Sequence, residues 1–236
     1  MSDALLTVDS LTAGYGHADV LHEISIEVRA GEFATIVGAN GAGKSTLLKT
    51  IMGIVKGGSG TVTLEGHDLL RLPAHRRVSL GVAYVPEGRR VFPVMTVEEN
   101  LKVVARATGV NAVGIDKVLG LFPALARRRR TMAGSLSGGE QQMLAMGRAM
   151  VVNPKLLIAD EITLGLAPVV VDQLFDALRL MRDDGVAILL AEQNARVALD
   201  SATTGYVLEV GRITLRGSAQ DLRKDERVIA AYLENY

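Results

Sequence analysis

The glycine-rich segment at residues 38–45 has the residue types and the spacing needed to bind phosphate groups. It matches the pattern G-x-x-x-x-G-K-[ST], follows an apolar run at 33–37 and precedes the apolar pair Leu47-Leu48. Glycines let the backbone wrap closely around phosphates, and backbone N–H groups at a helix N-terminus donate hydrogen bonds to them. Lys44 would place a cation on the β- and γ-phosphate oxygens, and the Ser45 hydroxyl would bind Mg²⁺. We therefore predict an ATP and Mg²⁺ site formed by Gly38, Ala39, Asn40, Gly41, Ala42, Gly43, Lys44, Ser45 and Thr46.

Two carboxylates follow a second apolar run further along the chain. Residues 156–159 are apolar and are followed by Asp160 and Glu161, and in sheets of this kind the end of such a strand lies beside the phosphate loop. Asp160 would hold Mg²⁺, usually through water, and Glu161 would orient or deprotonate the water that attacks the γ-phosphorus. The alternative is an ordinary solvated acidic turn, but the phosphate loop upstream favours ATP hydrolysis.

A third segment, at residues 136–140, places a serine and two glycines at the start of an expected helix. Such a start is another anion site, and a chain that already has one phosphate loop does not need it for the same nucleotide. We therefore expect it to bind the ATP of another chain, although an ordinary glycine-containing helix cap is the alternative. The segment resembles the signature of ABC ATPases, and Lys44, Ser137 and Asp160 follow one another in the family's order. The residues concerned are Leu136, Ser137, Gly138, Gly139 and Glu140.

The elements that must position these residues alternate between strands and helices. The pattern predicts strands at 5–8, 24–28, 33–37, 61–64, 82–85, 156–159 and 186–191, and a hairpin of 204–209 and 212–216 around Val210-Gly211. It predicts helices at 97–107, 115–122, 138–151 with Ser137 as N-cap, 169–182, and a polar C-terminal helix that ends near Tyr236. The almost wholly apolar runs at 156–159 and 186–191 are typical of a parallel sheet buried on both faces, so we predict an α/β core with a helical insertion.

Composition excludes several classes of protein. The chain of 236 residues has 26 Lys and Arg against 26 Asp and Glu and contains no cysteine. The chain therefore lacks the net positive charge with which non-specific nucleic-acid-binding proteins attract phosphates. The absence of cysteine excludes disulfides and thiolate metal sites. The longest stretch without Asp, Glu, Lys or Arg, 33–43, is too short to span a membrane. We expect no nucleic-acid partner and a location inside the cell.

The resemblance to ABC ATPases assigns further residues and also shows departures from the general pattern. Tyr15 matches the aromatic position that stacks on adenine, with a packed surface tyrosine as the alternative. Glu87 stands where glutamine usually faces Mg²⁺ and water, and Gln193 stands at the switch position that usually holds histidine. Both can still act, since glutamate can bind Mg²⁺ and Gln193 can donate to a γ-phosphate oxygen. Ala167 replaces an aspartate that reaches across the dimer, and Ile162 replaces a proline.

Most of these departures belong to one branch of the family, with Ile162 and Ala159 less typical even there. The segments 86–93, 165–168, 192–196 and 205–209 resemble the second ATP-binding subunit of high-affinity branched-chain amino acid importers. That resemblance implies a second cassette or a second copy, two membrane subunits and an external substrate-binding protein. It also implies that the membrane subunit docks near Val91, Phe92, Pro93, Val94 and Met95, with core packing as the alternative. The basic run at 127–130 is interpreted as a solvated face, with no site assigned.

The fold that this resemblance implies is a single ABC ATPase cassette of the α/β class. It has a P-loop NTPase core with a mixed, largely parallel sheet and an N-terminal antiparallel β subdomain at 1–87 and 151–236, and a helical subdomain at 88–150. We expect the chain to lie on the cytoplasmic face of the inner membrane. A different cargo, such as urea, short amides or other amino acids, and a soluble assembly ATPase remain as alternatives.

Overall fold

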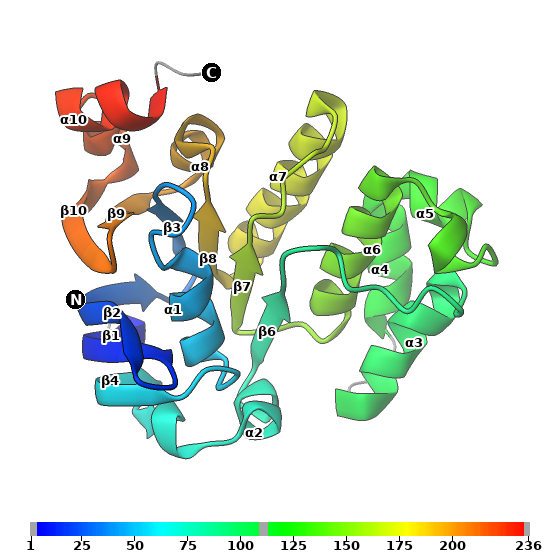
Figure 1. Cartoon of the computed structure of the whole chain (residues 1–236). Coiled ribbons are helices and arrows are strands. Elements are labelled where there is room, and N and C mark those ends of the chain that lie inside the picture. Colours follow the sequence, from blue (N-terminus) through cyan, green and yellow to red (C-terminus); the bar gives the residue numbers. More distant parts are fainter. Residues whose placement is uncertain (1–3, 109–112, 234–236) are drawn as a thin grey trace.

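The chain folds into two β-sheets, helices that cover them, and a group of helices on the other side of the molecule (Figure 1). The computed structural model describes residues 4–108 and 113–233. Within these ranges no helix is long and apolar enough to cross a lipid bilayer.

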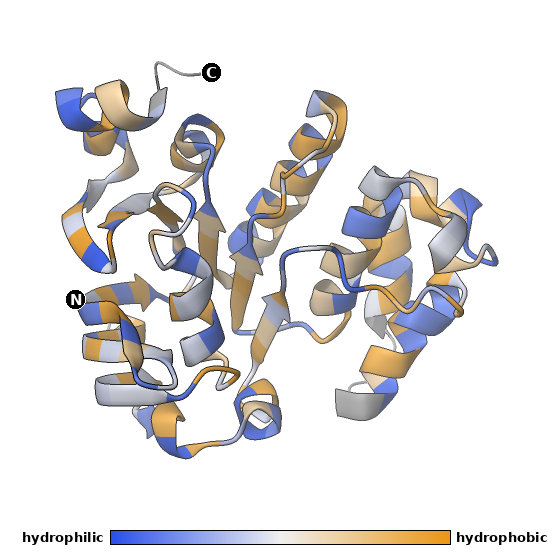
Figure 2. Cartoon of the chain, in the orientation of Figure 1, coloured by the Kyte–Doolittle hydropathy of each residue, from blue (hydrophilic) through white to orange (hydrophobic). Residues whose placement is uncertain are grey.

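The larger sheet has six strands in the order β10-β9-β3-β8-β7-β6. All neighbouring pairs are parallel except β9 and β10. Every residue of the central strands β3, β7 and β8 is buried, which confirms the predicted parallel sheet covered on both faces, and β7 and β8 are accordingly strongly hydrophobic in Figure 2. The strands are β3 (Phe33–Val37), β6 (Val82–Val85), β7 (Leu156–Asp160), β8 (Ala187–Glu192), β9 (Thr204–Glu209) and β10 (Arg212–Ser218).

The register of this sheet brings three loops to one edge. Val37 pairs with Glu192, and Asp160 pairs with Ala191, so β3, β7 and β8 end side by side. The loop after β3 is the glycine-rich segment, the loop after β7 begins with Glu161, and the loop after β8 begins with Gln193. The candidate site therefore lies at the carboxyl edge of the sheet, where ligands of open α/β sheets bind.

The smaller sheet is antiparallel, with the strand order β2-β1-β4-β5. Its apolar side shares one core with helix α1 (Lys44–Ile51) and with one face of the larger sheet, through residues such as Leu6, Leu48 and Ile36. Its strands are β1 (Ala4–Tyr15), β2 (Ala18–Arg29), β4 (Gly57–Leu64) and β5 (His67–Asp68). The predicted strands 5–8, 24–28 and 61–64 are present but longer, because bulges let β1 pair with two neighbours over most of its length.

Three further helices cover the opposite face of the larger sheet. Alternation along β3 turns Phe33 and Val37 to this side, and the ring of Phe33 stacks on Phe175 with centroids 6.4 Å apart. The helices are α6 (Gly138–Val151), α7 (Pro168–Asp183) and α8 (Ala195–Ser201). The predicted helices 138–151 and 169–182 are confirmed to within a residue.

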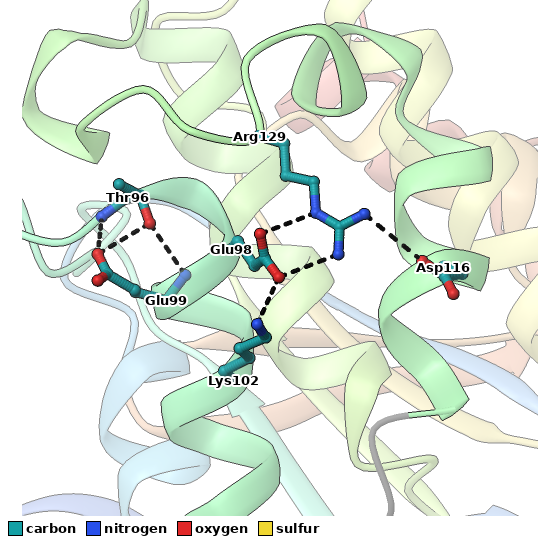
Figure 3. Close-up of polar contacts among 6 residues, drawn as sticks. All are labelled: Thr96, Glu98, Glu99, Lys102, Asp116 and Arg129. Carbon is teal, nitrogen blue, oxygen red and sulfur yellow. Dashed lines mark hydrogen bonds and ion pairs between the residues drawn. The ribbon is translucent and has the colours of Figure 1, made fainter.

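The remaining helices form the group at the right of Figure 1, next to α6. They are α3 (Val97–Thr108), α4 (Val113–Leu121), α5 (Pro123–Arg127) and the 3-10 turn η2 (Ala133–Ser135). Thr96 and Glu99 cap the start of α3 reciprocally, and Arg129 donates two hydrogen bonds to Glu98 at 2.9 and 3.0 Å (Figure 3). The hydrogen bonds from Arg129 and Lys102 lower the pKa of Glu98 to about 2. The division into a core and a helical subdomain at 88–150 stays a prediction.

Several stretches differ from the sequence prediction. The 3-10 turn η1 (Leu69–Arg71) and helix α2 (Ala74–Ser79), which lead into β6, were not predicted, and neither were β5, α5, η2 and α8. The single C-terminal helix is wrong: the chain forms α9 (Ala219–Leu222), α10 (Glu226–Val228) and a π-helical turn η3 (Ile229–Leu233). Ser218 and Asp225 each accept a backbone N–H a few residues on and so begin a new helix. The predicted end at Tyr236 lies outside the described residues.

Candidate functional site

The glycine-rich loop runs from the end of β3 to the first residue of α1. Two of its positions require glycine, one because of close packing and one because of its backbone conformation. A Cβ atom on Gly38 would lie 2.3 Å from the Leu208 carbonyl oxygen, and Gly43 caps α1 with a φ of 111°, a conformation that only glycine adopts without strain. The predicted strand, loop and helix order is confirmed, so the backbone N–H groups of this helix start are available to an anion.

Lys44 lies at the centre of the site, and its side chain is only 3% exposed. The Nζ atom donates to the carbonyl oxygens of Gly38 and Ala39 at 2.8 and 3.1 Å and forms an ion pair with Glu161 Oε1 at 3.0 Å. The structure therefore brings together the lysine of the loop and the carboxylate after β7, which the sequence placed 117 residues apart (44 to 161). An ammonium held by a carboxylate and two carbonyls is ready to exchange these partners for phosphate oxygens.

Asp160 is fully buried at the end of β7 and joins the same cluster. Its Oδ1 accepts a hydrogen bond from Ser45 Oγ at 2.9 Å, and its Oδ2 accepts one from the Tyr84 hydroxyl at 3.2 Å. Burial raises the pKa of Asp160, while the hydrogen bonds from Ser45 and Tyr84 act in the opposite direction. Burial and the neighbouring Asp160 also raise the pKa of Tyr84, so this tyrosine remains a neutral donor.

The oxygens of Ser45 and Asp160 are of the kind that Mg²⁺ prefers. Among the described residues no group of three or more His, Cys, Asp or Glu side chains is arranged to hold a metal ion. A Mg²⁺ ion at this place would therefore take its other oxygen ligands from water and from the phosphates, as is usual for nucleotide-bound Mg²⁺.

Glu161 has a left-handed backbone conformation, with a φ of 45°. Its N–H donates to the carbonyl oxygen of Ala191 at 2.9 Å. Two residues on, Thr163 donates from its N–H to Glu192 Oε1 at 3.0 Å and from its hydroxyl to Oε2 at 2.9 Å. The loop after β7 is therefore fastened to the end of β8 at two points.

The other residues predicted for this site lie around the cluster. Gln193 follows β8 directly and is partly buried, and Glu87 is exposed two residues beyond the end of β6. Tyr15 ends β1 and is 53% exposed, which leaves its ring free to stack on a ligand. The roles of these three side chains stay predictions.

The segment at 136–140 lies at the start of α6, on the side of α3, α4 and α5, and not beside the glycine-rich loop (Figure 1). Ser137 caps α6 by accepting from Glu140 N–H at 3.3 Å, and the Glu140 carboxylate accepts from Ser137 N–H at 2.8 Å, which confirms the predicted N-cap. The guanidinium of Arg89 lies against Gly138, and Arg128 pairs with Glu140 at 3.0 Å. Arg127, Arg128 and Arg130 are exposed, which confirms the predicted solvated face, and Arg128 and Arg129 also form ion pairs there.

Residues 91–95 form an exposed apolar surface beside the loop that holds Glu87. Val94 is 83% exposed and Phe92 is 39% exposed. The guanidinium of Arg148, on α6, lies 4.4 Å from the centre of the Phe92 ring and donates to the Arg90 carbonyl oxygen at 2.7 Å. This surface is therefore attached directly to the helix that begins at the Ser137 segment.

Comparison with known proteins decides the family. Residues 21–164 match the family model described as ABC transporter. The chain belongs to the ABC transporter family. As a member, it is an ATP-hydrolysing cassette of the α/β class.

Individual ABC relatives match along almost the whole chain. The high-affinity branched-chain amino acid transport ATP-binding protein BraG of Pseudomonas aeruginosa is 47% identical, covering 97% of this chain and 99% of its own. The probable branched-chain amino acid transport ATP-binding protein LivF of Archaeoglobus fulgidus is 40% identical, covering 94% and 96%. Among solved structures, an ABC transporter cassette in its ADP conformation is 25% identical with a TM-score of 0.86, covering 99% of this chain and 100% of its own.

The sequence did not predict three residues that contact the candidate site or the surface at 91–95. Tyr84 lies in an expected strand, Glu192 follows the run at 186–191, and Arg148 lies inside the predicted helix 138–151. Each contacts a partner that is distant in sequence, namely Asp160, Thr163 and Phe92. Of these three, only Glu192 had a signal in the sequence, because it is a charged residue directly after the apolar run 186–191.

Proposed function

We propose that the chain is the ATP-binding subunit that energises an importer of branched-chain or related amino acids. The cluster of Lys44, Ser45, Asp160 and Glu161, in which Lys44 and Asp160 are buried, carries the proposal for ATP hydrolysis. The near full-length likeness to BraG supports the cargo class and the importer. An ATPase subunit does not contact the cargo, so this part rests on the relatives.

In the proposed reaction the loop at 38–46 holds the triphosphate through its N–H groups and Lys44. Glu161 leaves Lys44 when the phosphates arrive and accepts a hydrogen bond from the water that attacks the γ-phosphorus. Gln193 donates to a γ-phosphate oxygen, and Tyr15 stacks on the adenine. When bound, Mg²⁺ would neutralise charge on the β- and γ-oxygens, held by Ser45 and Asp160, with Glu87 facing it.

We further propose that two cassettes act as a head-to-tail dimer. The phosphate loop and the Ser137 segment lie on different parts of one chain, which supports a site completed by a second cassette. ATP would then favour the closed dimer, because only there do residues 136–140 reach the γ-phosphate, and hydrolysis would remove that contact. To shift the ratio of closed to open dimer from 1:99 to 99:1, ATP must bind the closed dimer more tightly by about 5.5 kcal/mol.

The apolar surface at 91–95 is the proposed docking surface for the membrane subunits. Val94 projects into solvent, and Phe92 is connected through Arg148 to α6, so docking there would be transmitted to the Ser137 segment. In this proposal the chain lies on the cytoplasmic face of the membrane as a peripheral subunit. The external binding protein would act on it only through the membrane subunits.

Purification of the tagged chain from its native cells in mild detergent tests the importer. We expect two membrane proteins with several spans each to accompany the chain, together with a second cassette if the dimer is mixed. Recovery with soluble partners alone would contradict the importer and indicate an assembly ATPase.

A matched pair of variants tests the docking surface. Val94→Asp is expected to lower recovery of the membrane proteins at least severalfold, because a charge would have to be buried in the interface. Val210→Asp changes a side chain that is equally exposed, at 86% against 83%, in the β9–β10 turn, and should recover them like the native chain. Equal recovery with both variants would exclude this surface.

A further inference from the structure

Glu192 is a buried carboxylate that the proposed reaction does not use. It is the last residue of β8 and only 2% exposed. Both of its carboxylate oxygens accept hydrogen bonds from Thr163, at 3.0 Å from the N–H and 2.9 Å from the hydroxyl. A buried carboxylate held by neutral donors is costly and contributes little to stability compared with an apolar side chain of the same size. Its presence therefore calls for a role other than stability.

The segment that Glu192 holds begins at Glu161. Glu161 adopts the left-handed region with a φ of 45°, which is unfavourable for a residue with a side chain. Such a conformation persists only when the surrounding structure enforces it. Two attachments do so here, the hydrogen bond from Glu161 N–H to the Ala191 carbonyl oxygen at 2.9 Å and the pair of bonds between Thr163 and Glu192.

The hydrogen bonds between Thr163 and Glu192 also connect Thr163 to Gln193. Gln193 directly follows Glu192 in the chain, so the residue that accepts from Thr163 is bonded to the residue predicted to contact the γ-phosphate. Ile162, between Glu161 and Thr163, is 1% exposed and packs in the core, which leaves the segment little freedom. The positions of Glu161 and Gln193 relative to each other are therefore fixed.

We propose that Glu192 is a positioning residue for ATP hydrolysis. Through Thr163 it keeps Glu161 in its left-handed conformation and at a fixed position relative to Gln193. The inference rests on the proposed function, in which Glu161 orients the attacking water. It predicts that loosening the attachment slows hydrolysis without weakening ATP binding. In the proposed function the phosphates are held by residues 38–46, whereas both hydrogen bonds of the Glu192 carboxylate come from Thr163.

Matched substitutions at both partners test this role. Thr163→Val removes the hydroxyl and keeps the shape, and Glu192→Met keeps the length and removes both acceptors. Each is expected to lower kcat for ATP hydrolysis by roughly tenfold or more with KM for ATP unchanged, because small displacements of a reacting group are costly. Thr163→Ser and Glu192→Gln keep hydrogen-bonding groups in place and should retain most of the native kcat.

The measurement uses the full chain with its co-purified membrane proteins, at saturating Mg²⁺ and ATP, with Tm recorded for every variant. Glu192→Met should keep or raise Tm while kcat falls, whereas a structural role would lower Tm and leave the kcat of the folded fraction unchanged. Native kcat in both Thr163→Val and Glu192→Met would overturn the proposal. If one of these variants does not fold, the other one decides.

A double variant separates this inference from the proposed function. In a Glu161→Gln background, Thr163→Val should cause no further loss of hydrolysis, because the residue that it positions is already disabled. A further tenfold loss would overturn the proposed route through Glu161. If Glu161→Gln alone hydrolyses ATP like the native chain, the role of Glu161 in the proposed function fails, whatever the result at Thr163.

Discussion

At the scale of single residues, the site is built around Lys44, whose present polar partners could be exchanged for the phosphate oxygens of a nucleotide. Lys44 is paired with Glu161 and with two carbonyl oxygens of its own loop, so its charge is compensated before any phosphate binds. Phosphate oxygens would replace these partners without leaving the ammonium unpaired, which keeps the cost of binding small. In the proposed reaction the same exchange would free the Glu161 carboxylate to act on the attacking water.

The tyrosine that faces Asp160 gives a prediction at this scale. Tyr84→Phe removes the hydrogen bond to Asp160 Oδ2, so the carboxylate is less well oriented toward Mg²⁺. We expect the Mg²⁺ concentration for half-maximal hydrolysis to rise about fivefold, the equivalent of about 1 kcal/mol for one hydrogen bond. Tyr206→Phe is the control, because its hydroxyl contacts the Glu27 backbone away from the site. Equal Mg²⁺ dependence of the two variants would contradict this role.

The burial of Glu192 makes stability depend on pH. Burial raises the pKa of Glu192 from 4.5 to about 7, with Glu161 acting in the same direction and Thr163 and Lys44 in the opposite one. Between these values the folded chain binds more protons than the unfolded chain, so the free energy of unfolding falls as pH rises. The contribution of Glu192 is present below pH 4.5 and lost by about pH 7, and it is on the order of 3 kcal/mol.

Denaturant unfolding at a series of pH values tests this dependence. Glu192→Gln carries no charge at any pH and keeps hydrogen-bonding groups toward Thr163, so its free energy of unfolding should fall less between pH 4.5 and 7 than that of the native chain. Parallel pH profiles for the two proteins would show that Glu192 does not titrate in this range.

At the scale of elements, helix α7 begins without a side-chain cap. Its N-cap is Ala167, which is exposed and has no side-chain hydrogen bond, and Pro168 is at the first helical position. Ala167→Asp should add a hydrogen bond to a free backbone N–H and raise the free energy of unfolding by about 1 kcal/mol, or Tm by about 2–4 °C. Differential scanning calorimetry measures the change. Ala167→Asn tests the cap without the charge, and a lower Tm in both variants would contradict the prediction.

The sequence predicted those parts of the fold and site that depend on neighbouring residues. The glycine-rich loop, the capping of α6 by Ser137 and the apolar strand before Asp160 each lie within a few residues, so spacing was sufficient to find them. Contacts of Tyr84, Glu192 and Arg148 could not be predicted, because the pairing of strands and the packing of α6 create them. The C-terminal helix was wrong because Ser218 and Asp225 favour new helix starts over continuation.

At the scale of the whole molecule, the phosphate loop and the Ser137 segment lie in different parts of the chain, and we propose that they belong to two different nucleotide sites. The register of β3, β7 and β8 gathers the phosphate loop, Asp160, Glu161 and Gln193 at one sheet edge, while the Ser137 segment begins α6 in the other part of the molecule (Figure 1). Arg148 and Phe92 connect that helix to the exposed apolar surface at 91–95. This arrangement is suited to coupling ATP binding between two cassettes with movement at a docked membrane subunit.

Binding of ATP between two cassettes is tested most directly by the molar mass of a hydrolysis-deficient variant. Glu161→Gln is mixed with ATP and with any co-purified second cassette, and the mass is measured by light scattering. We predict an ATP-dependent dimer that persists with Ser137→Asn added and is lost with Ser137→Asp. Both substitutions keep a good N-cap, but the carboxylate would repel the γ-phosphate. A chain that stays monomeric with ATP and the second cassette, or that dimerises equally with Ser137→Asp, would contradict ATP binding between two cassettes.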